Sequence, residues 1–143
     1  MRIVDILEAK GSTVATISGD ATVGDAVAEL ARRSIGALVV STDGSHIEGI
    51  ISERDVVRRL GREQEGLMRR PVRAIMSAPV HTCAPDDTTE NVMATMTNRR
   101  VRHVPVVADG AMVGLVSIGD VVKSRIQELE EDAKVLVEYI GAR

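Results

Sequence analysis

The amino-acid sequence predicts an α/β (α+β) fold made of two β-α-β-β-α units and an extended C-terminal helix. Three observations support this fold class: an internal repeat, apolar residues at helical or strand spacing within each copy, and a near absence of aromatic side chains. The chain has 143 residues, with no Phe, no Trp and one Tyr. Its core is therefore aliphatic, and the β-branched residues favour closely packed strands.

The internal repeat is visible as a constant offset between two segments. Asp20 of the first copy aligns with Asp86 of the second, 66 positions later. After a turn that is one residue shorter, Ser52 aligns with Ser117, 65 positions later. Offsets that stay constant over about 45 residues indicate a duplicated structural unit.

Each copy predicts the same elements in the same order. A short strand comes first, and a helix with apolar residues at helical spacing begins near Thr22 in one copy and near Thr88 in the other. Two apolar runs joined by turn residues then indicate a hairpin, and a second helix follows the serine that ends it. The expected strands are residues 13–17, 35–40 and 47–52, and residues 80–83, 101–107 and 112–117.

Short helical segments are expected before each unit, near residues 4–9 and 71–77, and the polar residues 61–70 connect the units. A single unit of this size buries little surface, whereas two packed units share one core. We therefore expect a division into residues 1–69, with the N-terminal segment and connector, and residues 70–143, with the C-terminal helix.

The last helix carries apolar residues spaced alternately by four and three, which is a heptad pattern shorter than three heptads. Two interpretations are open: the helix lies along its own domain, or it contacts a second helix in a dimer. The apolar residues are Val122, Ile126, Leu129, Ala133, Leu136 and Ile140.

Charge and composition exclude several classes of protein. The net charge of −3 and the lack of aromatic platforms argue against a nucleic-acid partner. Ten arginines against six acidic residues between Arg54 and His103 indicate a local anion site. The single cysteine, Cys83, allows no intrachain disulfide, and the charged N-terminal segment predicts neither a signal peptide nor a membrane span. We expect a cytoplasmic protein with no membrane partner.

A Gly-x-x-Ser-x-x-Asp element ends each hairpin, at Gly49–Asp55 and again at Gly114–Asp120. Each carboxylate can accept hydrogen bonds from ribose hydroxyls, while the serine and the free amides of the helix can bind phosphate oxygens. The same spacing is a capping box, in which serine and aspartate only satisfy amides of their own helix. Both interpretations stay open on these residues alone.

The duplicated unit, the two Gly-x-x-Ser-x-x-Asp ends and the strand VRHVPVV at residues 101–107 together resemble the CBS (cystathionine β-synthase) domain family. The resemblance covers essentially the whole chain. It implies two CBS repeats packed through their sheets with pseudo-twofold symmetry, forming a Bateman module that pairs into homodimers. Modules of this kind bind adenosine ligands such as AMP, ATP, NAD(H) or S-adenosylmethionine in their clefts.

The resemblance also implies roles for individual residues. Serine and aspartate of each motif would hold ribose and phosphate. The basic pair Arg102 and His103, just before Pro105, would face phosphates. In the first copy Gly36 and Ala37 stand in place of that pair. We therefore expect the better phosphate site beside Ser117 and Asp120, with main chain and apolar side chains recognising the base. The predicted nucleotide-binding residues are Thr16, Ile17, Ala37, Leu38, Val39, Ser52, Arg54 and Asp55 in the first copy, and Thr82, Cys83, Arg102, His103, Val104, Pro105, Ser117 and Asp120 in the second.

The resulting functional hypothesis is a regulatory module that senses an adenine nucleotide (AMP, ATP or NAD(H)) and transmits binding by conformational or oligomeric change, to an unknown regulated protein or within a homodimer. The alternative is a structural or interaction module in which the motifs are only helix caps. No catalytic residues, catalytic cofactor or metal are expected, because His81 and Cys83 lack a third ligand and the chain is too short for a catalytic barrel. We therefore expect no enzyme activity.

Overall fold

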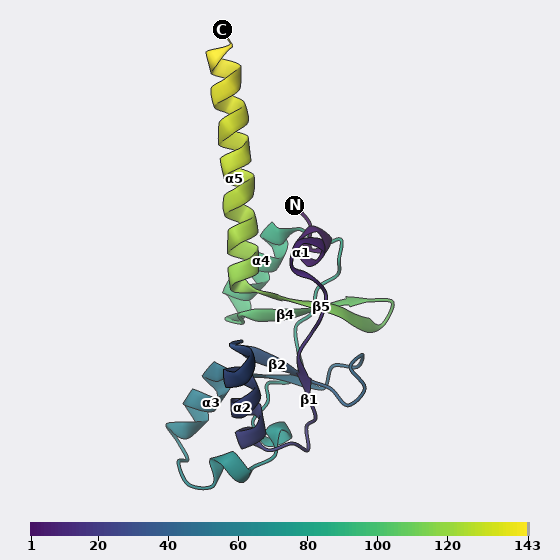
Figure 1. Cartoon of the computed structure of the whole chain (residues 1–143), viewed down its shortest axis with the longest axis vertical. Coiled ribbons are helices and arrows are strands. Elements are labelled where there is room, and N and C mark those ends of the chain that lie inside the picture. The colour runs from purple at the N-terminus through teal and green to yellow at the C-terminus, as the bar shows by residue number, and fades with distance from the viewer. Residues whose placement is uncertain (143) are drawn as a thin grey trace.

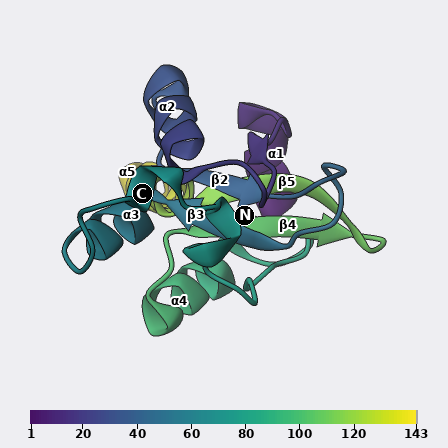
Figure 2. The same cartoon turned by 90° about the horizontal axis from the view of Figure 1, so that it is seen from below.

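The computed structural model describes residues 1–142 and contains two stacked units, from which one helix projects (Figure 1). Figure 2 shows the strands of both units at the centre and most of the helices around them. The first unit comprises β1 (Thr16–Ile17), α2 (Val23–Arg33), β2 (Ala37–Val40), β3 (Gly49–Ser52) and α3 (Glu53–Leu60). The second comprises α4 (Thr89–Arg99), β4 (His103–Ala108), β5 (Ala111–Ser117) and α5 (Ile118–Gly141). The predicted fold class is confirmed, including the long C-terminal helix.

Helix boundaries follow from capping residues at equivalent places. Thr22 accepts a hydrogen bond from the Asp25 amide and Thr88 from the Asn91 amide, so both helices begin where the sequence predicts. The same helices end at Ser34 and at Arg100, whose φ angles of 53° and 54° lie in the left-handed region. The duplication therefore extends to backbone conformation at the helix ends.

The two sheets differ at their first strand. In the first unit β1 runs parallel to β2, with Val39 N–H donating to Ala15 O and Ser41 N–H donating to Ile17 O. The predicted strand at residues 80–83 is reduced to a single bridge between Cys83 and Val106. Pro105 occupies the position equivalent to Val39 and has no N–H, so one of the two ladder bonds cannot form. The hairpins β2–β3 and β4–β5 are antiparallel, as expected.

Each leading segment packs against the other unit. Helix α1 (Ile3–Lys10) buries Ile3, Ile6 and Leu7 among residues of α4, β4, β5 and α5. The connector, with η1 (Leu67–Arg69) and η2 (Val72–Ala74), buries Leu67 and Val72 in the core of the first unit. The division at residues 69 and 70 stays a prediction, and the chain crosses between the units on both sides of it.

The segment expected as a helix at residues 71–77 forms only the short η2, because Ser77 pairs through its N–H and C=O with Ile50 of β3, at 2.8 and 3.0 Å. A further cluster joins the two sheets, with Ala37, Val39 and Ile50 buried beside Met112 and Leu115. The units therefore pack through their sheets. The equivalent bridges Arg2–Thr88 and Thr22–Pro71 show the pseudo-twofold relation between the two leading segments.

The glycines that open the two Gly-x-x-Ser-x-x-Asp elements make room for these crossing segments. A Cβ at Gly114 would lie 2.6 Å from Leu7 Cδ2, and a Cβ at Gly49 would lie 2.5 Å from Met76 Sδ and 3.0 Å from the Ser77 carbonyl oxygen. Real Cβ contacts are longer than this. The motif's glycine therefore serves the packing between units.

Gly49→Ala is expected to lower the free energy of unfolding by about 1–3 kcal/mol, because the new methyl group must displace backbone as well as a side chain. Urea unfolding followed by circular dichroism measures the change. Gly61→Ala is the matched control, since its Cβ would meet no atom nearer than 3.5 Å and its backbone is helical. A Gly49→Ala protein as stable as the control would contradict this packing role.

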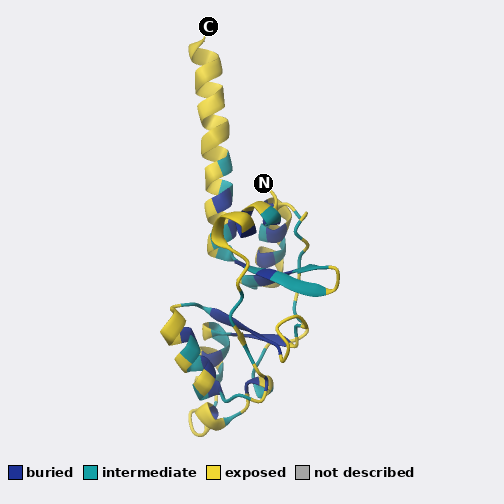
Figure 3. Cartoon of the chain, turned by 45° about the vertical axis from the view of Figure 1, so that its right-hand side comes forward, coloured by how far each residue is buried: buried dark blue, intermediate teal, exposed yellow. Residues whose placement is uncertain are grey.

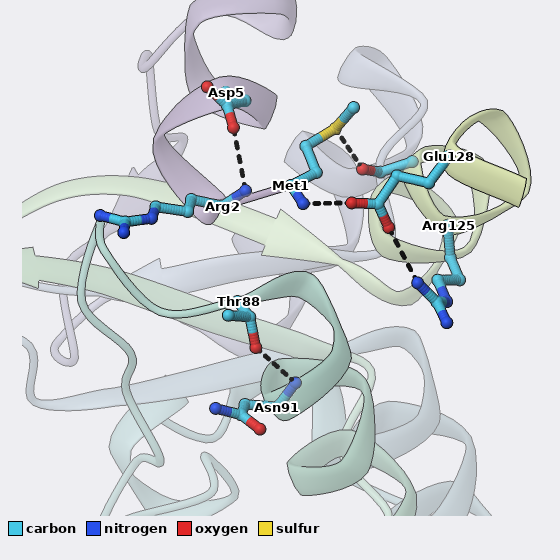
Figure 4. Close-up of polar contacts among 8 residues, drawn as sticks. Met1, Arg2, Asp5, Thr88, Asn91, Arg125 and Glu128 are labelled. Carbon is cyan, nitrogen blue, oxygen red and sulfur yellow. Dashed lines mark hydrogen bonds and ion pairs between the residues drawn. The ribbon is translucent and has the colours of Figure 1, made fainter. Parts of the chain in front are cut away.

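Helix α5 is anchored only at its base. Val121 and Ser124 are buried, and Glu128 pairs with the N-terminal amino group of Met1 and accepts from Arg125 (Figure 4). Beyond these turns the helix is exposed along its length (Figure 3). Of the two sequence interpretations, a helix lying along its own domain is therefore wrong. No helix within residues 1–142 is long and apolar enough to cross a membrane.

Candidate functional site

A cleft of about 600 Å³ opens between the two units, and we call it the interunit cleft. Its first-unit wall comes from the end of β3 and the first turns of α3, and its second-unit wall from the start of β4 and the junction of β5 with α5. The chain between Ser77 and His81 lies along it. The predicted site residues that line it are Ser52, Arg54, Asp55, Arg102, His103 and Ser117.

Ser52 and Asp55 form a complete capping box at the start of α3. Ser52 Oγ accepts from the Asp55 amide at 3.3 Å, and Asp55 Oδ2 accepts from the Ser52 amide at 2.8 Å. The second carboxylate oxygen, Oδ1, accepts a bond from the Ser77 hydroxyl at 3.1 Å. Capping therefore uses mainly Oδ2, and Oδ1 can accept further hydrogen bonds from a molecule in the cleft.

Ser117 and Asp120 form the same box at the start of α5, with bonds of 3.2 and 2.9 Å. Here Lys10 of α1 reaches Asp120 Oδ2 at 2.7 Å and also donates to the Leu115 carbonyl oxygen. Burial alone raises the pKa of the Asp120 carboxyl, but bonds from Lys10 and Ser117 outweigh it and hold the pKa below its usual value. Ser117 lines the interunit cleft, whereas Asp120 does not.

The second-unit wall supplies positive charge through its arginines, with a neutral imidazole beside them. Arg102 and His103 lie at the start of β4, with His103 opposite Ser117 in the hairpin register. Burial lowers the pKa of His103, so its ring is neutral at pH 7. Gly36, which replaces a basic residue in the first copy, lies against the imidazole, since a Cβ there would be 3.4 Å from His103 Cε1.

Further lining residues were missed from the sequence. Arg58 lies one helical turn after Arg54, so the i, i+4 spacing could have identified it. Arg100 is the left-handed residue that ends α4, and His81 belongs to the segment that crosses between units. Four arginines thus line the cleft, against the two acidic residues Glu53 and Asp55.

The structure brings Arg102 and His103 into one cleft with Ser52 and Asp55. The sequence hypothesis placed them beside Ser117 and Asp120; His103 does lie opposite Ser117 in the hairpin, and a nucleotide at that motif stays a prediction. The other predicted residues lie outside the lining of the interunit cleft: Ala37, Leu38, Val39, Val104 and Pro105 are buried in strands, Ile17 and Cys83 are half-buried, and Thr16 and Thr82 are exposed. Their roles stay predictions.

Cys83 is unsuited to nucleophilic or ligand chemistry at neutral pH. Burial raises the pKa of its thiol to about 12, and Asp87 adds to this effect, so the sulfur stays protonated. Among residues 1–142, no group of three or more His, Cys, Asp or Glu side chains is placed to hold a metal ion.

Comparison with known proteins places this geometry in a family. A family model described as the CBS domain matches the chain twice, over residues 5–62 and 72–126. The chain is 35% identical over 146 residues to a mitochondrial CBS domain-containing protein of Arabidopsis thaliana, an alignment that covers 96% of this chain and 71% of the relative.

Solved structures agree. A CBS-domain containing protein from Agrobacterium tumefaciens superposes with a TM-score of 0.84 at 37% identity, covering 87% of this chain and 92% of that chain. A CBS domain protein from Pyrobaculum aerophilum, complexed with AMP, superposes with a TM-score of 0.73 at 26% identity, covering 84% and 89%. With two family matches over most of its length, this chain belongs to the CBS domain family as a tandem CBS-domain protein, its two domains forming a Bateman module.

Proposed function

We propose that this CBS pair is a regulatory, non-catalytic module that binds an adenine nucleotide (AMP, ATP or NAD(H)) in the interunit cleft. The observation that carries the proposal is the meeting of Asp55 from one unit with Arg102 and His103 from the other. The volume of about 600 Å³ lies within the usual range for small-molecule sites. The Pyrobaculum relative complexed with AMP supports the ligand class.

The lining suggests how the ligand would be divided along the cleft. Asp55 Oδ1 would accept hydrogen bonds from the ribose hydroxyls, beside the Ser52 cap. The arginines and His103 would meet the phosphates, since charge-assisted hydrogen bonds to phosphate are strong. Apolar side chains of the lining, Ile50, Val80 and Val101, would contact the base.

Binding in this place would couple the two units. A ligand held by both α3 and β4 binds most tightly when those elements are at one separation, so it shifts the population toward that arrangement. We propose that a conformational or oligomeric change, within a homodimer or toward a regulated protein, is the output. The cytoplasm is our proposed location, whereas the Arabidopsis relative is named as mitochondrial.

The second predicted site, around Asp120, stays a prediction of lower rank. A ribose there would compete with Lys10, which already holds the carboxylate at 2.7 Å. Occupation of that site would therefore displace the end of α1. We expect the interunit cleft to fill first.

Isothermal titration calorimetry with AMP, ATP and NADH tests the proposal on the full chain. The expected result is saturable binding of at least one of them with one site per chain. Inosine monophosphate is the control for recognition of the base, because it keeps the ribose and phosphate of AMP and changes only the edge of the purine. Absence of heat for all three adenine nucleotides at millimolar concentration would exclude the proposed ligand class.

A structural or interaction module is the second candidate function. It is favoured by the complete capping boxes at Ser52 and Ser117, which give each motif a role without any ligand. The two candidate functions differ in the expected effect of substituting Asp55. In a structural module the substitution lowers only stability, whereas in a nucleotide-binding module it also removes binding.

A further inference from the structure

Helix α5 carries an apolar face that points away from its own module. The residues that anchor it, Val121, Ser124 and Glu128, recur at intervals of three and four and so share one face. The heptad residues Val122, Ile126, Leu129, Ala133, Leu136 and Ile140, which we call the α5 stripe, lie about a third of a turn round the helix from that face. Bending α5 toward its own module would therefore bring the wrong face into contact.

The α5 stripe is uncovered within residues 1–142. Ile126 and Leu129 are each 52% exposed, Leu136 is 61% exposed and Ile140 is 70% exposed. A contiguous apolar face of this kind on a long helix is typical of an interface. Val137 is 69% exposed and broadens the same face near the helix end.

The residue types of the stripe indicate what covers it. In heptad terms, the a positions are Ile126, Ala133 and Ile140, and the d positions are Val122, Leu129 and Leu136. Within parallel coiled coils, isoleucine at a with leucine at d favours two strands over three or four. We infer that the α5 stripe pairs in parallel with the same stripe of a second copy of this chain.

Charges beside the stripe select the parallel orientation. In a parallel pair, the g position Arg125 faces the e position Glu130 of the second copy, and symmetry repeats this attraction. In an antiparallel pair with the stripes fully overlapped, Glu130 would face Glu130 and Asp132 would face Asp132 of the second copy. Two like-charge contacts make that arrangement unfavourable.

The position of the module is compatible with this pairing. Both units lie at the N-terminal end of α5, in line with its axis (Figure 1). Parallel pairing therefore places the two modules side by side at one end of the paired helices. Since the stripe spans fewer than three heptads, we expect a dimer that dissociates on dilution.

Molar mass measured by light scattering across a concentration series tests the inference. The wild-type chain is expected to approach twice its 15.3 kDa mass at high micromolar concentration. Leu129→Glu introduces a charge at the centre of the stripe and is expected to weaken dimerisation at least ~10-fold. Because Leu129 is exposed in the single chain, the variant keeps its fold, which circular dichroism verifies.

Gln127→Glu is the matched control, because it adds the same charge on the exposed surface outside the stripe. It is expected to dimerise like the wild type. A wild-type chain that is monomeric throughout the series would overturn the inference. So would a dimer that Leu129→Glu leaves intact, since other surfaces would then hold it and the stripe would serve a different partner.

Cysteine cross-linking determines orientation. In the parallel pair, Ala133→Cys places two thiols opposite each other at an a position, and a mild oxidant is expected to join the copies. Val135→Cys, at an outward position, is expected to stay uncross-linked. The native Cys83 is present in both variants, and its half-buried, protonated thiol competes poorly. Equal cross-linking of the two variants would contradict parallel pairing.

Discussion

Asp55→Ala is expected to weaken adenine-nucleotide binding by at least ~100-fold, since hydrogen bonds to a charged group contribute about 1.5–3 kcal/mol each. The same change removes the acceptor of the Ser52 amide, so the free energy of unfolding is expected to fall by about 0.5–2 kcal/mol. Calorimetric titration with the tightest-binding nucleotide measures the first effect, and urea unfolding measures the second.

Asp120→Ala is the matched comparison, because it breaks an equivalent capping box without touching the lining of the interunit cleft. We expect a similar loss of stability with affinity changed by less than ~3-fold. Loss of binding in Asp120→Ala alone would instead place the nucleotide at the second motif. If the motifs are only caps, both variants lose stability and there is no binding to lose.

Ile3→Ala is expected to lower the free energy of unfolding by about 2–5 kcal/mol, a large share of the stability of a small protein. Ile3 is fully buried although it lies at the start of α1, because α1 packs into the core of the second unit. Urea unfolding at a fixed protein concentration measures the effect, which keeps any dimer contribution constant.

Val57→Ala is the control for this substitution. Val57 is 67% exposed on α3, so its truncation is expected to change the free energy of unfolding by less than ~0.5 kcal/mol. An Ile3→Ala protein as stable as Val57→Ala would show that α1 contributes little to the core. It would contradict the exchange of leading segments, by which each of them packs against the other unit.

The secondary structure was predictable because the repeat displays each element twice. Thr22 and Thr88 begin helices through the same hydrogen bond, from the amide three residues later to the threonine hydroxyl. A bond between residues so close in the chain can be predicted from the sequence. The loss of the strand at residues 80–83 was predictable in principle, since Pro105 cannot donate. The position of the missing hydrogen bond, however, depends on which carbonyl group of the neighbouring segment lies opposite Pro105. That pairing is set by the strand register.

The composition of the cleft was only partly predictable. Arg102 and His103 were identified from the sequence. Which aspartate shares their cleft depends on how the two sheets pack, and the spacing of residues within one unit does not predict that packing. For the same reason, the apolar pattern of Ile3, Ile6 and Leu7 predicts an amphipathic helix without showing which core receives it. Long-range packing, more than local structure, separates the sequence prediction from the lining of the interunit cleft.

The exchange of leading segments also has a consequence for biosynthesis. α1 is translated before the residues that cover it, which extend from Val92 to Val121. At ordinary elongation speeds, its apolar side chains stay uncovered for roughly 5–20 s. The nascent chain therefore carries an exposed apolar segment until the last third of the protein has left the ribosome, and this interval is when chaperones can act on it.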